Sequence, residues 1–224
     1  MKKAIITCII ITFISCQKDI ELTLPAHQYF IDIAMRSEIR PQDLNIRKWT
    51  KDIKIHFEGL KYSEFNNEKQ RVIDELNDLI DEISIDIVDE RDEANVIGVF
   101  SIYEDYKENY EPIFCDFFPN ATSVRGAGNV IPIKGEIQSA TFFVNVGEIS
   151  SGRFSSIYRE ELTQILGLPN DTDTYPESIF FNGEDSYVTE YADIDKEIIK
   201  ILYSDAIKPN MNRCQVKKAL SRLE

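Results

Sequence analysis

The stretch that decides the fold is Arg159-Glu160-Glu161-Leu162-Thr163-Gln164-Ile165-Leu166-Gly167-Leu168-Pro169-Asn170-Asp171. Its apolar residues, counted from Tyr158, recur at i, i+4, i+7 and i+8, which is the pattern of a helix with one buried face. Ser155 and Ser156 are candidates to cap the start of this helix, and Gly167 can end it in a left-handed turn. The sequence therefore predicts one amphipathic helix that stops at a glycine.

Three polar residues of this helix point in similar directions. At about 100° per residue, Glu160, Glu161 and Gln164 fall within one arc beside the apolar stripe. A helix that directs two carboxylates and an amide to one side, and then turns at a glycine, has the form of a metal-site helix. Glu160 and Glu161 are adjacent, so they do not form a close acid-base pair by themselves.

The stretch resembles the zinc-binding motif of the metzincin proteases, His-Glu-x-x-His-x-x-Gly-x-x-His. Laid on that pattern, Glu160 and Gln164 take the two helical His positions and Asn170 takes the third. Glu161 keeps the position of the general base, and Gly167 keeps the glycine of the turn. The resemblance implies a degenerate metal site in which all three zinc ligands are replaced.

Further resemblances follow along the chain. Ser178-Ile179-Phe180 resembles the Met-turn with Phe180 in place of Met, and Ile201-Leu202-Tyr203 resembles the end of the closing helix. Together with Pro209-Asn210-Met211, these elements resemble a family of bacterial lipoproteins of uncharacterised function. The resemblance covers residues 158–211 and implies an α+β, zincin-like fold. In that fold a twisted mixed sheet packs on two main helices and is followed by a C-terminal helical subdomain.

Composition and charge narrow the class of protein. The chain has 224 residues, of which 43% are hydrophobic and 11% aromatic, enough for one domain with a proper core. The formal net charge of −14 opposes binding to nucleic acid and to anionic lipid headgroups. No basic patch, phosphate-binding glycine loop or nucleophile elbow stands out, so we expect no nucleic-acid partner.

The N-terminus has the features of an export signal. A basic start is followed by the apolar run Ala4 to Ile14, which is too short to span a bilayer. The sequence Phe13-Ile14-Ser15-Cys16 resembles a lipobox, which implies cleavage before Cys16, acylation of its thiol and anchoring to the bacterial envelope. The alternative is an ordinary signal in which Cys16 is incidental. We predict a signal peptide at 1–15, a lipid-anchored tether at 16–25 and a single domain at 26–224.

The side of the membrane that the anchored domain faces is left open by the sequence. Gln17-Lys18-Asp19 resembles the start that some bacterial lipoproteins use for export to the cell surface. The alternative is a solvated linker, with the domain facing the periplasm from the outer membrane.

The remaining chain reads as alternating strands and helices. Periodicity and composition predict strands at 53–57, 85–88, 96–102 and 140–146 and a helix from residue 66 to 83. Residues 28–39 fit either a short helix or a strand and turn. Residues 103–132 show no clear period, and we interpret them as a long aromatic excursion over the sheet. This excursion either lines a substrate cleft or simply covers the core.

The residue types at the motif argue against zinc. A catalytic zinc site commonly takes three protein ligands, and the chain has only two histidines, His27 and His56, neither at the motif. Amide oxygens such as those of Gln164 and Asn170 are weak zinc ligands. We therefore expect no zinc and no other cofactor, with these residues forming a polar network instead. Calcium or another hard ion stays open, because oxygen ligands suit it.

Two cysteines, Cys115 and Cys214, belong to the mature domain. An exported protein permits a disulfide between them, and buried thiols are the alternative. Three functions remain open for the whole chain. They are non-catalytic binding of a peptide, glycan or envelope protein in the cleft, metal-dependent hydrolysis using Glu161, and a structural role in the envelope.

Overall fold

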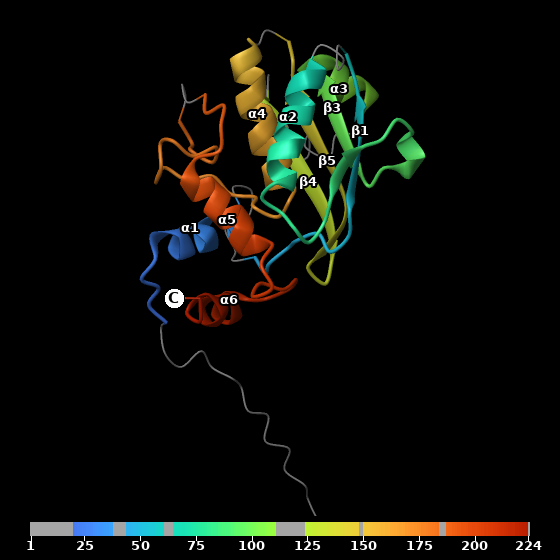
Figure 1. Ribbon diagram of the computed structural model, residues 1–224. Helices are drawn as coiled ribbons and strands as arrows, with labels where there is room; N and C mark the ends of the chain where they lie inside the picture. The colour runs from blue at the N-terminus through green and yellow to red at the C-terminus, as the bar shows by residue number, and fades with distance from the viewer. Residues whose placement is uncertain are drawn as a thin grey trace, which may run out of the picture.

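The computed structural model describes residues 20–37, 44–60, 65–110, 124–147, 150–183 and 187–223 (Figure 1). The predicted signal peptide, Cys16, most of the tether and Cys115 lie outside these ranges, so the predictions made for them stay predictions. No helix in the described part of the chain is long and apolar enough to cross a membrane.

A five-stranded sheet forms the centre of the fold, in the order β2-β1-β3-β5-β4. Strand β1 pairs in parallel with β2 and β3, and β3 pairs in parallel with β5. Strand β4 pairs antiparallel with β5 and forms one edge of the sheet. The bounds are β1 Ile53–Glu58, β2 Ile85–Ile87, β3 Val96–Ser101, β4 Gly126–Ile133 and β5 Glu136–Asn145.

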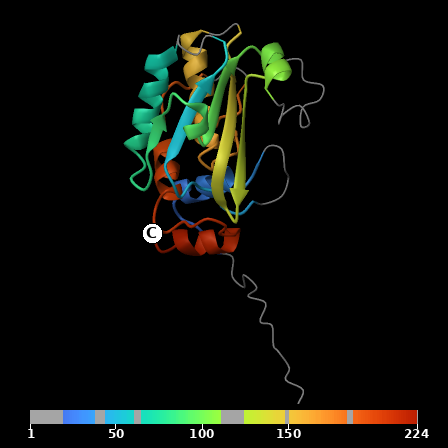
Figure 2. The ribbon, with the colours of Figure 1, turned by 90° about the vertical axis from the view of Figure 1, so that its right-hand side faces the viewer.

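Helices cover both faces of this sheet (Figure 2). Helices α2 (Asn66–Asn77) and α4 (Ser151–Gln164) pack on one face, where they contact β2, β4 and β5. A cluster of aromatic rings fills this layer, with contacts of Phe100 to Phe142, Phe154 and Tyr158. Helix α3 (Tyr103–Asn109) packs on the other face, where Tyr106 stacks on Phe143. The short helix η2 (Arg91–Glu93) follows β2 and precedes β3 in the sequence.

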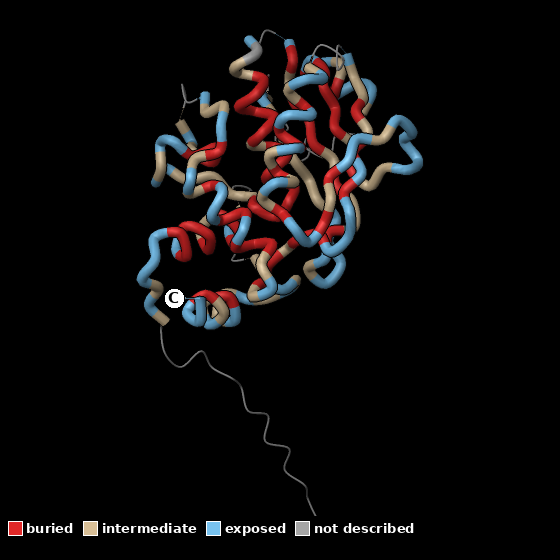
Figure 3. The backbone as a smooth tube through the Cα atoms, in the orientation of Figure 1, coloured by how far each residue is buried: buried red, intermediate tan, exposed pale blue. Residues whose placement is uncertain are grey.

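Three further helices gather at one end of the molecule. They are α1 (Pro25–Ala34), α5 (Asp193–Leu202) and α6 (Arg213–Leu220), and α1 contacts the other two. Figure 3 shows that α1 is buried along most of its length, whereas α5 has both buried and exposed residues. The predicted C-terminal helical subdomain is therefore completed by a helix from the N-terminal end of the domain.

The predicted α+β architecture is confirmed, with a mixed sheet packed on two main helices. The prediction of a long aromatic excursion was wrong in part, because α3 and all but the last residue of β4 lie within residues 103–132. The helix predicted to reach residue 83 ends at Asn77. Residues 28–34 are helical and belong to α1, which settles the choice between helix and strand.

Candidate functional site

The motif helix α4 begins earlier than the sequence suggested. Its cap is Ser150, whose hydroxyl accepts a hydrogen bond from the backbone N–H of Arg153 at 3.3 Å. The predicted caps Ser155 and Ser156 are buried within the helix instead. Ser155 donates a hydrogen bond to Glu68 of α2, so this residue fastens two helices together.

A buried arginine fixes α4 against α2. The side chain of Arg159 is fully buried and donates to Glu68 at 3.1 Å and to Glu75 at 2.6 Å. Its guanidinium also lies 5.2 Å from the ring centre of Tyr191. Breaking a buried pair of this kind leaves a charge uncompensated, so the arrangement holds α4 in one position.

The C-terminal end of α4 is closed by a glycine and two aromatic side chains. Gly167 has φ +119°, and a Cβ there would overlap the backbone carbonyl oxygen of Arg47. Trp49 donates its indole N–H to the carbonyl of Ile165 at 2.9 Å, and Tyr203 donates its hydroxyl to the carbonyl of Leu166 at 3.0 Å. These donors satisfy carbonyls that a helix end leaves unpaired. Burial raises the pKa of Tyr203 far above its usual value, so it remains a donor.

The carboxylate of Glu161 packs against the edge strand β4. Its side chain is 5% exposed, so this carboxylate lies inside the fold. A Cβ at Gly126 would lie 2.7 Å from Cγ of Glu161, and one at Gly128 would lie 3.4 Å from Oε2. The two glycines therefore provide the space that this side chain occupies. They also bring the backbone of β4 against the candidate general base.

The turn after Gly167 brings Asp171 to the motif helix. The amide nitrogen of Gln164 donates to Oδ1 of Asp171 at 3.0 Å. The amide nitrogen of Asn170 donates to the backbone carbonyls of Asp32 in α1, at 3.0 Å, and of Asp171, at 2.9 Å. Asn170 thus ties the turn to α1. Asp171 is the residue that the motif comparison missed, and the signal was its position directly after the third ligand position.

Phe180 is fully buried and lies in a turn held by a second polar cluster. Ser178 donates to Asp195 of α5 at 2.5 Å and contacts the hydroxyl of Tyr29 in α1 at 2.8 Å. Asp195 also accepts the backbone N–H groups of Ile179, at 3.1 Å, and Ala192, at 3.0 Å. The Ser-Ile-Phe turn is thereby fixed between α1 and α5.

Asp195 has an altered proton affinity in this cluster. Burial raises its pKa from 3.8 to about 6, and the hydrogen bonds from Ser178, Ile179 and Ala192 limit the rise. The sequence comparison identified the turn but did not single out Asp195 as its partner.

The residues at the three ligand positions do not fit a zinc centre. They supply one carboxylate, Glu160, and two amides whose nitrogens are bound to protein oxygens. Over the ranges that the structure describes, no three His, Cys, Asp or Glu side chains gather into a metal-binding group. His56 lies on β1 and contacts the carbonyl of Val88, and His27 is buried in α1.

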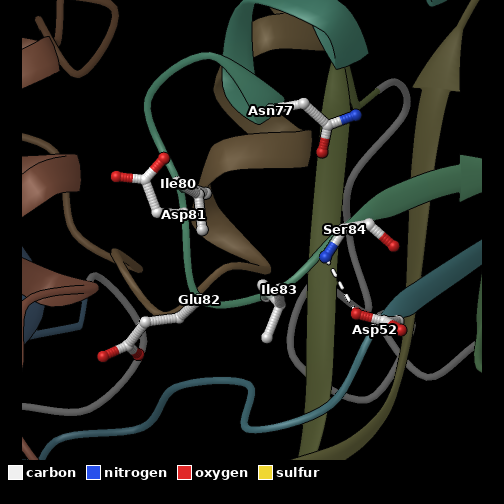
Figure 4. Close-up of a pocket in the computed structure, with 7 residues that line it drawn as sticks. All are labelled: Asp52, Asn77, Ile80, Asp81, Glu82, Ile83 and Ser84. Atoms are coloured by element: carbon white, nitrogen blue, oxygen red, sulfur yellow. Dashed lines mark hydrogen bonds between the residues drawn. The ribbon is translucent and has the colours of Figure 1, made fainter.

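A surface hollow of about 390 Å³ lies at the end of α2, at the β2 side of the sheet. It is lined by Asp52, Asn77, Ile80, Asp81, Glu82, Ile83 and Ser84 (Figure 4). Asp52 accepts the backbone N–H of Ser84 at 2.9 Å, and Lys48 pairs with Glu82 at 2.9 Å. None of the motif residues lines this hollow.

Of the two mature-domain cysteines, Cys214 lies in α6 and is disulfide-bonded. The second cysteine of this bond is not among the described residues. The pairing with Cys115 therefore stays a prediction.

The fold and the site together define an α+β domain with a mixed five-stranded sheet. In this domain the motif helix and the turn after it carry one carboxylate, Glu160, and two amides, Gln164 and Asn170, at the three ligand positions of the resembled motif. A family comparison supports one part of the resemblance described above, namely that the chain belongs to a group of proteins of unknown function. The chain belongs to the DUF2927 family, described as proteins of unknown function, whose model matches residues 25–222. No curated protein matches the sequence.

Solved structures with a similar fold include two of myroilysin and one archaemetzincin. One myroilysin structure is 12% identical over 81% of this chain and 97% of that chain, with a TM-score of 0.42. The other is 13% identical over 70% and 82%, with a TM-score of 0.41. The archaemetzincin from Methanopyrus kandleri is 10% identical over 76% and 94%, with a TM-score of 0.34.

Proposed function

We propose that this chain is an exported lipoprotein whose zincin-like domain binds an extended peptide segment without cleaving it. The observation that carries the proposal is the state of the motif side chains. Glu161 is packed into the space over Gly126 and Gly128, and the amides of Gln164 and Asn170 are bonded to protein oxygens. These polar groups therefore pack α4 on β4 and hold the turn after α4. Because they are occupied in this way, we favour binding over cleavage.

The edge strand β4 offers the place for such a peptide. Asn145 donates its backbone N–H to the carbonyl of Arg125 at 2.8 Å, which marks this opposed pair as hydrogen-bonded. In an antiparallel ladder the hydrogen-bonded pairs alternate, so Gly126, Gly128 and Val130 direct their backbone groups away from β5. Among the described residues, no strand pairs with this outer edge. An extended peptide can add to a strand edge through main-chain hydrogen bonds.

A proline substitution in β4 tests this proposal. Proline at Val130 removes one outward N–H, and proline is tolerated on edge strands when its missing N–H faces away from the sheet. We expect Val130→Pro to weaken binding to an array of short random peptides, while Val130→Ala, which keeps the N–H, binds them as the unchanged protein does. Equal binding by both variants would exclude strand addition at this edge.

Hydrolysis is the second candidate, favoured by the carboxylate of Glu161 at the general-base position. Peptide cleavage by the purified mature chain, lost in Glu161→Ala, would support hydrolysis over binding alone. We expect both the purified mature chain and its Glu161→Ala variant to leave the peptides intact, as measured by mass spectrometry after prolonged incubation.

The membrane anchor is tested separately. We expect Cys16→Ala to abolish incorporation of labelled palmitate and to release the protein into the soluble fraction, because several acyl chains anchor a protein stably where one does not. Unchanged labelling in this variant would remove the lipoprotein assignment.

A further inference from the structure

Positive charge is concentrated at the C-terminal end of this acidic protein. Residues 206–223 contain five basic side chains and no acidic one, whereas the whole chain has a net charge of −14. The five are Lys208, Arg213, Lys217, Lys218 and Arg222. The net charge of the chain therefore conceals one segment of opposite sign.

Helix α6 directs part of this charge away from the fold. Val216 and Leu220 are buried and define the inner face of the helix. Lys218 on α6 and Arg222, two residues beyond its last helical residue, are both exposed and lie four residues apart. Within the described part of the chain, neither side chain has an ion-pair partner, whereas Lys208 pairs with Asp205 at 3.2 Å.

Helix α6 lies near the point where the chain enters the fold. Helix α6 forms one end of the molecule in both views, and α1, at the start of the domain, contacts it (Figures 1 and 2). Ile20, the first described residue, follows Cys16 by four positions, a span of at most about 14 Å when extended. A lipid on Cys16 would therefore keep this end of the domain close to the bilayer.

We propose that the outer face of α6 is a membrane-docking surface that binds anionic phospholipid headgroups. Basic side chains near a negatively charged leaflet are attracted over roughly a Debye length, while the acidic remainder of the domain is repelled. The combination turns α6 toward the bilayer. This inference uses the proposed anchor only for orientation, and the charge pattern stands without it.

The test uses the mature chain from residue 16 with Cys16→Ala, so that no acyl group contributes. Binding is measured by co-sedimentation with vesicles of phosphatidylcholine containing phosphatidylglycerol, and with vesicles of phosphatidylcholine alone. We expect binding only to the anionic vesicles, and we expect it to weaken as salt is raised. Neutralising two charges in Lys218→Gln/Arg222→Gln should weaken binding by roughly tenfold or more, since each basic residue near the surface contributes measurably.

A matched control is available on α5. Lys196 and Lys200 are also exposed and four residues apart, so Lys196→Gln/Lys200→Gln changes the net charge equally on another helix. We expect this variant to bind as the parent does, and melting temperatures should show both variants folded. Equal loss in both variants, or equal binding to neutral vesicles, would overturn the docking surface. Failure here leaves the palmitate and peptide results unaffected, so the two proposals fail separately.

Discussion

Glu161 and Gly126 depend on each other at the level of single atoms. A Cβ at Gly126 would lie 2.7 Å from Cγ of Glu161 and 2.7 Å from Cγ2 of Ile157. Gly126→Ala should therefore lower the free energy of unfolding by about 1–3 kcal/mol, the usual cost of overpacking. Urea unfolding measures this change.

The double variant provides the control for this pair. Shortening the side chain in Glu161→Ala opens space beside residue 126, so Gly126→Ala should cost less in that background. Ile157 still crowds the position, so relief is expected to be partial. An identical cost of Gly126→Ala in both backgrounds would show that Glu161 does not fill this space.

Asp195 makes stability depend on pH. Its pKa is raised by burial to about 6 in the folded protein, against 3.8 for an unperturbed group, so the folded chain binds more protons between these values. The free energy of unfolding should then fall by about 3 kcal/mol as pH rises through this window, and level off above it. Urea titrations at several pH values measure the slope.

Asp195→Asn should remove this slope. An amide can accept the two backbone N–H groups through its oxygen and donate to Ser178 through its nitrogen, so the packing survives. A slope between pH 4 and 6 that persists unchanged in the variant would assign the titration to another group.

At the scale of elements, α4 shows which features of a helix the sequence predicts and which it does not. The spacing of Leu162, Ile165 and Leu166 predicts the helix, and Gly167 predicts its end, because both signals are local. Its start was wrong because Ser155, a good cap by type, is instead used in a tertiary bond to Glu68. The choice between capping and bridging depends on α2, which a local pattern does not contain.

Gly167 gives the sharpest test of how α4 ends. Gly167→Ala should destabilise the fold by about 1–3 kcal/mol or more, because φ +119° is strained for alanine and the Cβ would overlap the carbonyl of Arg47. Gly152→Ala is the matched control in the same helix, where the nearest atom to a new Cβ is 4.0 Å away. That variant should be neutral or stabilising by up to about 1 kcal/mol, as measured by thermal unfolding. Equal effects of the two substitutions would contradict the assigned turn.

Strand β4 shows why an element was missed. Its two glycines and Pro132 have low strand propensity, so the segment reads as a loop. Its glycines are explained by Ile157, Glu161 and Ile165 across the layer, and a proline can lie in β4 because this strand is at the sheet edge. The same limit applies to Asp171, whose contact with Gln164 depends on the path of the turn after Gly167.

At the scale of the whole molecule, the order of strands and helices carried most of the fold prediction. Strand β1 follows from the alternation of apolar and polar residues, β3 and β5 follow from their apolar runs, and the two main helices follow from their periodicity. The joining of α1 to α5 and α6 was not predictable, because it brings together segments from the two ends of the domain. The hydrogen bond from Asn170, in the turn after α4, to the carbonyl of Asp32 in α1 likewise depends on the three-dimensional arrangement.

Zinc content of the purified mature chain tests the non-catalytic site most directly. We predict no stoichiometric zinc by elemental analysis, and a melting temperature that chelator leaves unchanged. A metal bound only to the folded state would add about 2.7 kcal/mol at a hundredfold excess over its Kd, so its removal would be visible. One zinc per chain, removed by chelator together with a fall in melting temperature, would contradict the proposed loss of the metal site.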